Sequence, residues 1–526
     1  MRSGDSEAGA DLRAGPWPNQ PMAPAAANNV VPASNTAPWL AGALLLVAGL
    51  RLWRLPEAGP VDYDSVRNWQ VVQELARGDF AHLFHHGSPG FLLLYAPVAW
   101  LAQQFLVFQG LNALLGVAGL GAFGAWVARQ ARLRGPEAAG LVLLAGTSLL
   151  LTFSGHDFTM SSGSLVIFAG LLRAHYQRLH QPSAGALLRT AVWLAAGLAF
   201  NYKFLFAVPI LAVLEAWRAD GLWRTPGLWW RGLLVLAAPY LVLGAVGVAA
   251  GLPWYRWLGF YVRTVVPAAA NGAGRRGTLH LDLLYYPRYL LGYESPLLLV
   301  GLAAAAGLVG RSWYQRGLRR SQPLPLLAYL LVWAGCLLGG LSLLLKAPRG
   351  LLFVYLSLAA LAVLSGRRLM PKWALTLALA LAVGLNVFRL QRELYRPLPS
   401  RYPAVAAWLR ARGATRVAST VGLGLAPYLA RNQTLTVIND ERPVAALRRA
   451  GYDYLLLDGY WRVAGVARFD SLRRQRPVAA WPAPELHSAL LFLEHSEFTG
   501  LGFTETLAAR RAAAADTLPL RLYRLK

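Results

Sequence analysis

Charged side chains are scarce in this chain. They account for 14% of its 526 residues, whereas hydrophobic residues account for 56%. Because soluble globular proteins carry about 25% charged residues, this shortage excludes a soluble fold over most of the length and predicts a membrane protein with many spans. Acids are scarcer still, with 25 Asp and Glu against 51 Lys and Arg. The arginines fall in short clusters between apolar segments, which indicates membrane loops and no nucleic-acid partner.

Cysteine is nearly absent as well. Cys336 is the single cysteine and lies in an apolar segment, so no disulfide within the chain can hold a part of it outside the cell. Residues 1–36 are rich in Ala, Pro and Asn, and they lack the basic start and the cleavage site of a signal peptide. This composition predicts a disordered cytoplasmic tail.

Five clusters of basic residues set the predicted topology. With all five on the cytoplasmic side, the region 37–391 forms a mainly α-helical bundle of about eleven spans in the cell membrane, with its N-terminus inside. Residues 89–104 carry two prolines and the pair Gln103–Gln104, which favours a helix along the outer surface before a span at 106–128. The basic clusters lie at 129–134, 173–189, 218–231, 311–320 and 367–372. The expected spans are 39–53, 106–128, 137–155, 158–173, 187–200, 203–217, 231–251, 295–311, 324–345, 350–366 and 373–391.

The composition becomes that of a soluble protein at Pro397. Short β-patterned runs alternate with amphipathic helical patterns, which predicts a small α/β domain over 397–526 on the extracytoplasmic side. The predicted strands are TRVASTVG, TLTVIND, YDYLLLDG and LPLRLYRLK, and the predicted helices are PAVAAWLRARG and ERPVAALRRAG.

The most polar segment of the first half, 59–91, belongs to a predicted outer loop at 59–105. A segment that carries Asp62, Asp64 and His86 cannot lie in hydrocarbon, so we expect it at a membrane face, where it would form the catalytic loop. Asp64 is expected one position before a helix that runs to Gly78, and a purely structural helix cap is the ordinary alternative. Asp157, in SGHDFTMSS, places a further acid in an outward turn.

Basic residues occupy the next outward turns. Lys203 lies in FNYKFLF, and Lys346 and Arg349 lie in LLLKAPRGLLF. A lysine that snorkels from the membrane is the ordinary reading of Lys203, and a phosphate contact is the functional one. Histidines could bind a metal with Asp157, but their spacing does not favour a metal site, and we expect neither a metal nor another cofactor. These histidines are His82, His85, His86 and His156.

These motifs, in this order, resemble the GT-C class of integral-membrane glycosyltransferases, and in particular bacterial protein O-mannosyltransferases and aminoarabinose transferases. That family carries an acidic pair after its first span, a helix ending in Gly-Asp, and a His/Lys-Pro-Pro segment. This chain has DSVRNWQVVQELARGDF followed by HHGSPGF. The resemblance places Asp64 on the first acid and Ser65 on the second, which leaves open whether Asp62 takes the partner role. It also matches Asp157, Lys203, Lys346 and Arg349 to later family motifs.

The resemblance implies an inverting transferase that moves a sugar from a polyprenyl-phosphate carrier to a hydroxyl of a glycan, lipid or protein at the outer membrane face. A carboxylate, Asp64 or Asp62 with Asp157, would accept the hydroxyl proton. Lys203, Lys346, Arg349 and His86 would hold the carrier phosphate. A transporter or flippase of a lipid-linked or anionic substrate is the alternative, and a central path across the bilayer would favour it.

Overall fold

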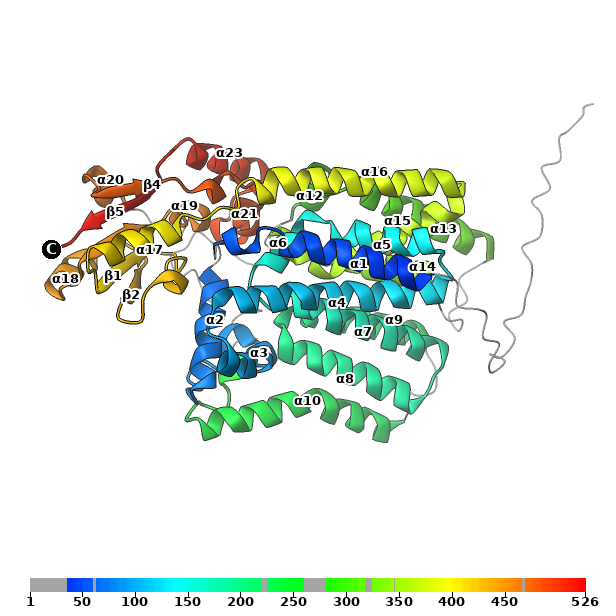
Figure 1. Cartoon of the computed structure of the whole chain (residues 1–526). Coiled ribbons are helices and arrows are strands. Elements are labelled where there is room, and N and C mark those ends of the chain that lie inside the picture. Colours follow the sequence, from blue (N-terminus) through cyan, green and yellow to red (C-terminus); the bar gives the residue numbers. More distant parts are fainter. Residues whose placement is uncertain are drawn as a thin grey trace, which may run out of the picture.

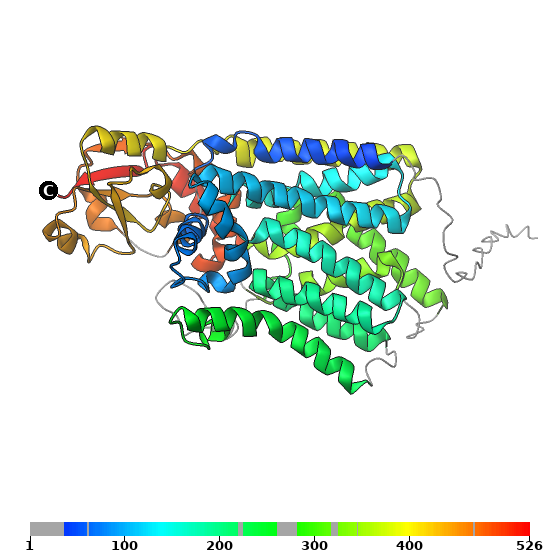
Figure 2. The ribbon, with the colours of Figure 1, turned by 60° about the horizontal axis from the view of Figure 1, so that its bottom comes forward.

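A bundle of roughly parallel helices with a small mixed sheet at one end makes up the protein (Figures 1 and 2). This computed structural model describes residues 36–59, 63–218, 225–259, 281–316, 324–344, 346–465 and 469–526. The predicted tail, apart from Thr36, and the candidate residue Asp62 lie outside the described residues.

The helices of the bundle follow the apolar segments of the sequence. Helix α3 is separate from α4, and α5 and α6 meet at a bend of 61°. That α3 lies along the outer surface stays a prediction. The helices are α1 (Thr36–Leu52), α2 (Tyr63–Ala76), α3 (Pro89–Leu101), α4 (Phe105–Ala131), α5 (Gly135–Gly146), α6 (Leu149–His156), α7 (Ser161–His180), α8 (Ala184–Phe200), α9 (Ala207–Arg218), α10 (Pro226–Ala249), α12 (Tyr285–Tyr293), α13 (Leu297–Arg316), α14 (Leu326–Leu341), α15 (Val354–Leu369) and α16 (Lys372–Leu390).

Helix α15 forms the centre of the bundle. It is apolar on all sides between its ends, and its residues 354–366 are buried, as expected for a helix surrounded by other helices. Small residues let its neighbours approach closely. A Cβ added to Gly301 of α13 would lie 2.4 Å from the Cα of Ala362, so only glycine fits at this crossing.

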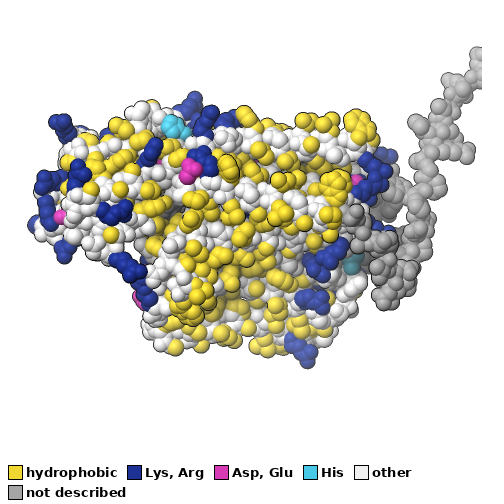
Figure 3. Space-filling view, viewed as in Figure 1, with side chains coloured by type: hydrophobic (Ala, Val, Ile, Leu, Met, Phe, Trp, Pro, Cys, Tyr) yellow, Lys and Arg dark blue, Asp and Glu magenta, His cyan; other side chains and the backbone are white. Residues whose placement is uncertain are grey.

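Six described helices are long and apolar enough to cross a membrane, and the bent pair α5 and α6 would make seven. The expected number of about eleven spans is therefore not confirmed. Helices α8, α9 and α14 have 17, 12 and 16 residues, fewer than the roughly 20 of a lone span. Figure 3 shows an apolar surface over the bundle with basic side chains toward both ends, which is the pattern of a multi-pass membrane protein.

The C-terminal domain contains all four predicted strands and one that was not predicted. The strand order is β2-β1-β3-β5-β4, with β1 parallel to β2 and β3, and β5 antiparallel to β3 and β4. Strand β4, AAW, is too short for an alternating pattern. The elements are α17 (Tyr402–Ala411), β1 (Arg416–Thr420), β2 (Thr434–Ile438), α18 (Val444–Arg449), β3 (Tyr454–Leu457), α19 (Trp461–Ala464), α20 (Asp470–Arg474), β4 (Ala479–Trp481), α21 (Ala489–Glu494), α22 (Ser496–Thr499), α23 (Phe503–Ala514) and β5 (Leu520–Arg524).

The sheet domain packs against one end of the bundle, which we call the domain end. The domain end includes the end of α1 and helix α2 (Figure 1). It also includes the short helix η5 (Pro348–Phe353), whose Arg349 pairs with Glu497 of the C-terminal domain, and the short helix η3 (Tyr202–Phe206), whose Lys203 donates to the carbonyl of Arg349. Tyr63, the first residue of α2, packs on the core of the sheet domain. The segments that carry Asp64, Lys203 and Arg349, each of which was expected to face outward, therefore meet at this end.

Candidate functional site

Asp64 lies at the domain end, in the first turn of α2. The sequence suggested that Asp64 is the residue before the helix. The described helix begins at Tyr63, however, so Asp64 lies inside it. A carboxylate in a first helical turn is stabilised by the unpaired backbone N–H groups there. The Asp64 side chain is about one-third exposed, which keeps the carboxylate within reach of a substrate.

The turn that carries Asp157 is held against α2 by hydrogen bonds. The backbone N–H of Phe158 donates to Ser65 Oγ at 2.5 Å, and the Asn68 amide donates to the carbonyl of Phe158 at 3.1 Å. From α4, the Asn112 amide donates to the carbonyl of Asp157 at 2.7 Å. Ser65 thus serves here to join the two acidic segments. Asp64 precedes Ser65 in the sequence, and Asp157 precedes Phe158. The hydrogen bond between Ser65 and Phe158 therefore joins the two segments that carry these acids.

His86 approaches the Asp64 carboxylate. Its Nε2 lies 3.1 Å from Asp64 Oδ1. The backbone of His86 has φ of 52°, and Gly87 follows with φ of 62°, so the chain makes an unusual left-handed turn that aims the imidazole at α2. Burial lowers the pKa of the adjacent His85 to about 2, and the neighbouring His86 adds to this effect, so His85 is neutral at pH 7.

Lys203, in η3, faces the same cluster. Its ammonium donates to the backbone carbonyl of Arg349 at 3.2 Å. Burial, and then the nearby Arg349 guanidinium, lower the pKa of Lys203 to about 8. The carboxylates of Glu497, Glu494 and Asp64 act in the opposite direction. The charged groups that act on Lys203 therefore include Asp64 of α2.

Arg349, in η5, binds two carboxylates of the C-terminal domain that the sequence analysis missed. Its Nη2 lies 2.5 Å from Glu497 Oε1, and its Nε lies 3.9 Å from Glu494 Oε2. Its guanidinium also lies over the ring of Phe498, 5.2 Å from the centroid. Burial raises the pKa of Glu494 to about 7, against the opposing effect of Arg349. The segment LLFLEHSEF is unusually apolar for a soluble domain, and that signal could have indicated a docking segment.

Lys346 has a different environment from Lys203. Its ammonium donates to the carbonyl of Ser342 at 2.9 Å and also to that of Leu344, at the end of α14. These contacts are those of a cation that caps a helix C-terminus. Its predicted role in phosphate binding stays a prediction. Within the described parts of the chain, no group of three or more His, Cys, Asp or Glu side chains has the arrangement of a metal site.

An apolar groove reaches Phe206, which belongs to the same short helix η3 as Lys203. Its volume is about 260 Å³, and it runs between α9 and α14. Val213 and Cys336 in its walls are exposed, so the groove opens on the side of the bundle. Its lining residues are Phe206, Pro209, Ile210, Val213, Cys336, Leu337, Gly340 and Leu341.

Two solved structures share this architecture. ArnT from Cupriavidus metallidurans bound to undecaprenyl phosphate is similar to the chain with a TM-score of 0.54 at 15% sequence identity, over 84% of this chain and 96% of that one. The chain has a GT-C-like fold. The apo state of the same protein gives a TM-score of 0.53 at 16% identity, over 82% and 96% of the two chains. No known protein family and no curated protein matches the sequence.

Proposed function

We propose that the chain is an inverting glycosyltransferase that moves a sugar from a polyprenyl-phosphate carrier to a hydroxyl acceptor at the outer membrane face. The observation that carries this proposal is at the domain end, where the Lys203 ammonium donates to the backbone carbonyl of Arg349 at 3.2 Å and the Asp64 carboxylate is among the charged groups that act on Lys203. An apolar groove reaches Phe206 of the same short helix as Lys203. The ArnT-like fold supports it, because one of the similar structures contains undecaprenyl phosphate. A hydroxyl of a glycan, a lipid or a protein is the acceptor.

The proposed reaction needs one base and a site for one developing anion. As the acceptor oxygen bonds to the anomeric carbon, its proton passes to the Asp64 carboxylate. The bond between that carbon and the carrier breaks, and its electron pair remains on the phosphate. Lys203 and Arg349, with His86 beside the carboxylate, stabilise the growing phosphate charge. Asp157 is the second acid of the site. Asp62 stays a candidate for the base, and Lys346 stays a candidate for binding the carrier phosphate.

The groove between α9 and α14 suits the carrier's lipid tail. Its walls are aliphatic and aromatic, and Phe206 belongs to the same short helix as Lys203. A tail that enters from the side would bring its phosphate to the ammonium without leaving the membrane. The groove thus favours a lipid carrier over a soluble nucleotide sugar as the donor.

Lys203→Met tests the donor site. Methionine keeps a flexible apolar stem and removes the charge, so we expect the fold to persist and the Kd for undecaprenyl phosphate to rise at least about tenfold. The measurement is a titration of the full chain in nanodiscs. Lys372→Met, at the exposed start of α16 on the other end of the bundle, is the matched control and should leave the Kd unchanged. An unchanged Kd for Lys203→Met would remove that residue from the donor site.

The lowered pKa of Lys203 predicts the alkaline limit of donor binding. The ammonium loses its proton as the pH rises through about 8, so donor binding should weaken above that pH and be complete below it. In Lys203→Arg the guanidinium stays charged, and the decline should move to higher pH. A titration of donor affinity from pH 6 to pH 10 compares the two proteins. The same decline in both would assign it to another group.

A further inference from the structure

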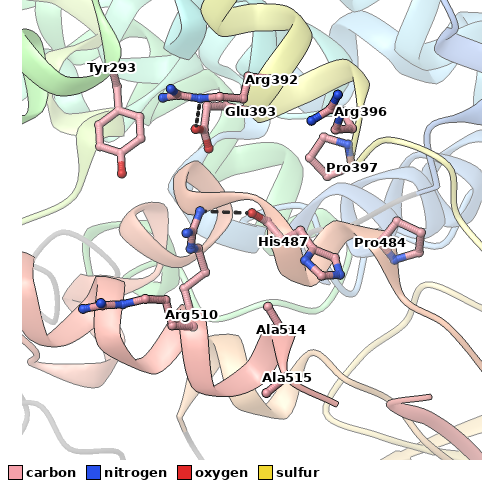
Figure 4. Close-up of a pocket in the computed structure, with 11 residues that line it drawn as sticks. Tyr293, Arg392, Glu393, Arg396, Pro397, Pro484, His487, Arg510, Ala514 and Ala515 are labelled. Carbon is pink, nitrogen blue, oxygen red and sulfur yellow. Dashed lines mark hydrogen bonds and ion pairs between the residues drawn. The ribbon is translucent and has the colours of Figure 1, made fainter. Parts of the chain in front are cut away.

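A second cavity, lined by several charged side chains, lies apart from the Asp64 cluster, where the end of α16 nearest the C-terminal domain meets α23. Its volume is about 900 Å³. Figure 4 shows that its walls come from the bundle on one side and from the C-terminal domain on the other. Helix α21 separates the two sites: the backbone N–H of Ala489 at its start points to Glu393 of this cavity, and Glu494 at its end faces Arg349. The lining residues are Tyr293, Arg392, Glu393, Arg396, Pro397, Pro484, His487, Arg510, Arg511, Ala514 and Ala515.

The cavity carries four arginines and one acid, and that acid is already satisfied. The Glu393 carboxylate accepts a hydrogen bond from Arg392 Nε at 2.7 Å and one from the backbone N–H of Ala489 at 3.3 Å. Its negative charge is compensated by the Arg392 guanidinium with which it forms an ion pair. The positive charges of the other arginines therefore remain largely uncompensated.

Three arginines are available to a ligand. The Arg510 Nη1 donates to the carbonyl of His487 at 3.2 Å, but its Nε is buried and has no hydrogen-bond partner among the residues that the structure describes. Arg396 and Arg511 are exposed and form no ion pair within the described part of the chain. A buried N–H donor without an acceptor is costly, and like charges in a concave site repel one another. An anion in the cavity would relieve both.

We propose that this cavity binds the phosphate group of an organic phosphate ester, as a site separate from the Asp64 cluster. The guanidinium fork matches phosphate oxygens in pairs, which makes arginine the preferred residue for this anion. The volume leaves room for a glycerol- or sugar-sized body beside the phosphate. The ester is either a soluble phosphate or the head group of an anionic lipid. A head group could reach the cavity because it adjoins the end of the candidate span Lys372–Tyr395. This proposal does not depend on the transferase activity.

The test uses the full chain in phosphatidylcholine nanodiscs at 150 mM salt, where diffuse surface attraction is screened. One arm titrates glycerol 1-phosphate by calorimetry, with glycerol as the uncharged reference. The other arm replaces part of the lipid by phosphatidylglycerol and counts retained lipid by native mass spectrometry. Binding in the first arm identifies a soluble ester, and selective retention in the second identifies a head group.

The variant Arg396→Gln/Arg511→Gln removes two exposed charges from the cavity, and we expect it to weaken binding at least about tenfold. Arg448→Gln/Arg449→Gln removes the same charge from α18, at the far end of the sheet domain in Figure 1, and should leave binding within about twofold. Arg511→Gln alone is a milder variant with an intermediate loss. Failure of the unmodified protein to bind in both arms overturns the proposal, and so does an equal loss in the α18 control.

Discussion

Asp64→Asn is expected to lower the rate of sugar transfer by a factor of about 10²–10⁴ while the protein still folds and binds its donor. Asparagine has nearly the same shape and is accepted at a helix start, so α2 should persist. Its amide cannot take the proton of the acceptor hydroxyl. Because Lys203 and Arg349 are unchanged, the Kd for undecaprenyl phosphate should stay within a few-fold of its original value.

Transfer by the purified protein in nanodiscs, followed by mass analysis of the glycosylated acceptor, measures this loss. Asp79→Asn is the matched control, because Asp79 is an exposed turn residue of the same loop whose Oδ1 accepts the N–H of Ala81 at 3.0 Å. It should remain active. If Asp64→Asn transfers normally and Asp62→Asn does not, the base is Asp62. If both transfer normally, the loop is not catalytic.

The sequence predicted those parts of the molecule that depend on local pattern. Apolar segments bounded by basic clusters indicated the bundle and its two ends, because hydrocarbon excludes charge wherever the chain folds. Period-two alternation indicated the strands β1, β2, β3 and β5 for an equally local reason. The order of motifs gave the GT-C-like fold, which the similar structures confirm.

Contacts between residues far apart in the sequence could not be predicted from local pattern. Arg349 and Glu497 are 148 positions apart, and no periodicity links them. The contacts of Lys346 depend on how α14 ends, which is set by packing. The role of Ser65 became clear only when its partner, the N–H of Phe158, was known. Span number was hard to predict for a related reason: a helix that packs along other helices, as α14 does along α15 and α13, can be shorter than one that crosses lipid alone.

The pairing of Arg349 with Glu497 leads to a prediction in which two variants change donor binding in opposite directions. Glu497→Gln removes the carboxylate that competes with the carrier phosphate for the guanidinium, and we expect the Kd for undecaprenyl phosphate to fall about threefold to fivefold. Arg349→Met removes the guanidinium itself and should raise that Kd at least about tenfold. Both variants should also lower the melting temperature, because the ion pair joins η5 to the C-terminal domain.

The double variant Arg349→Met/Glu497→Gln separates the two effects. Without the guanidinium, the carboxylate has nothing to mask, so the double variant should bind as weakly as Arg349→Met alone. Asp516→Asn serves as the control, because it breaks ion pairs with Arg462 and Arg521 inside the C-terminal domain and lies outside the proposed donor site. It should lower the melting temperature without changing the Kd. If Glu497→Gln weakens donor binding, the carboxylate supports the phosphate site and does not compete for it, and the C-terminal domain then holds Arg349 in place for the donor.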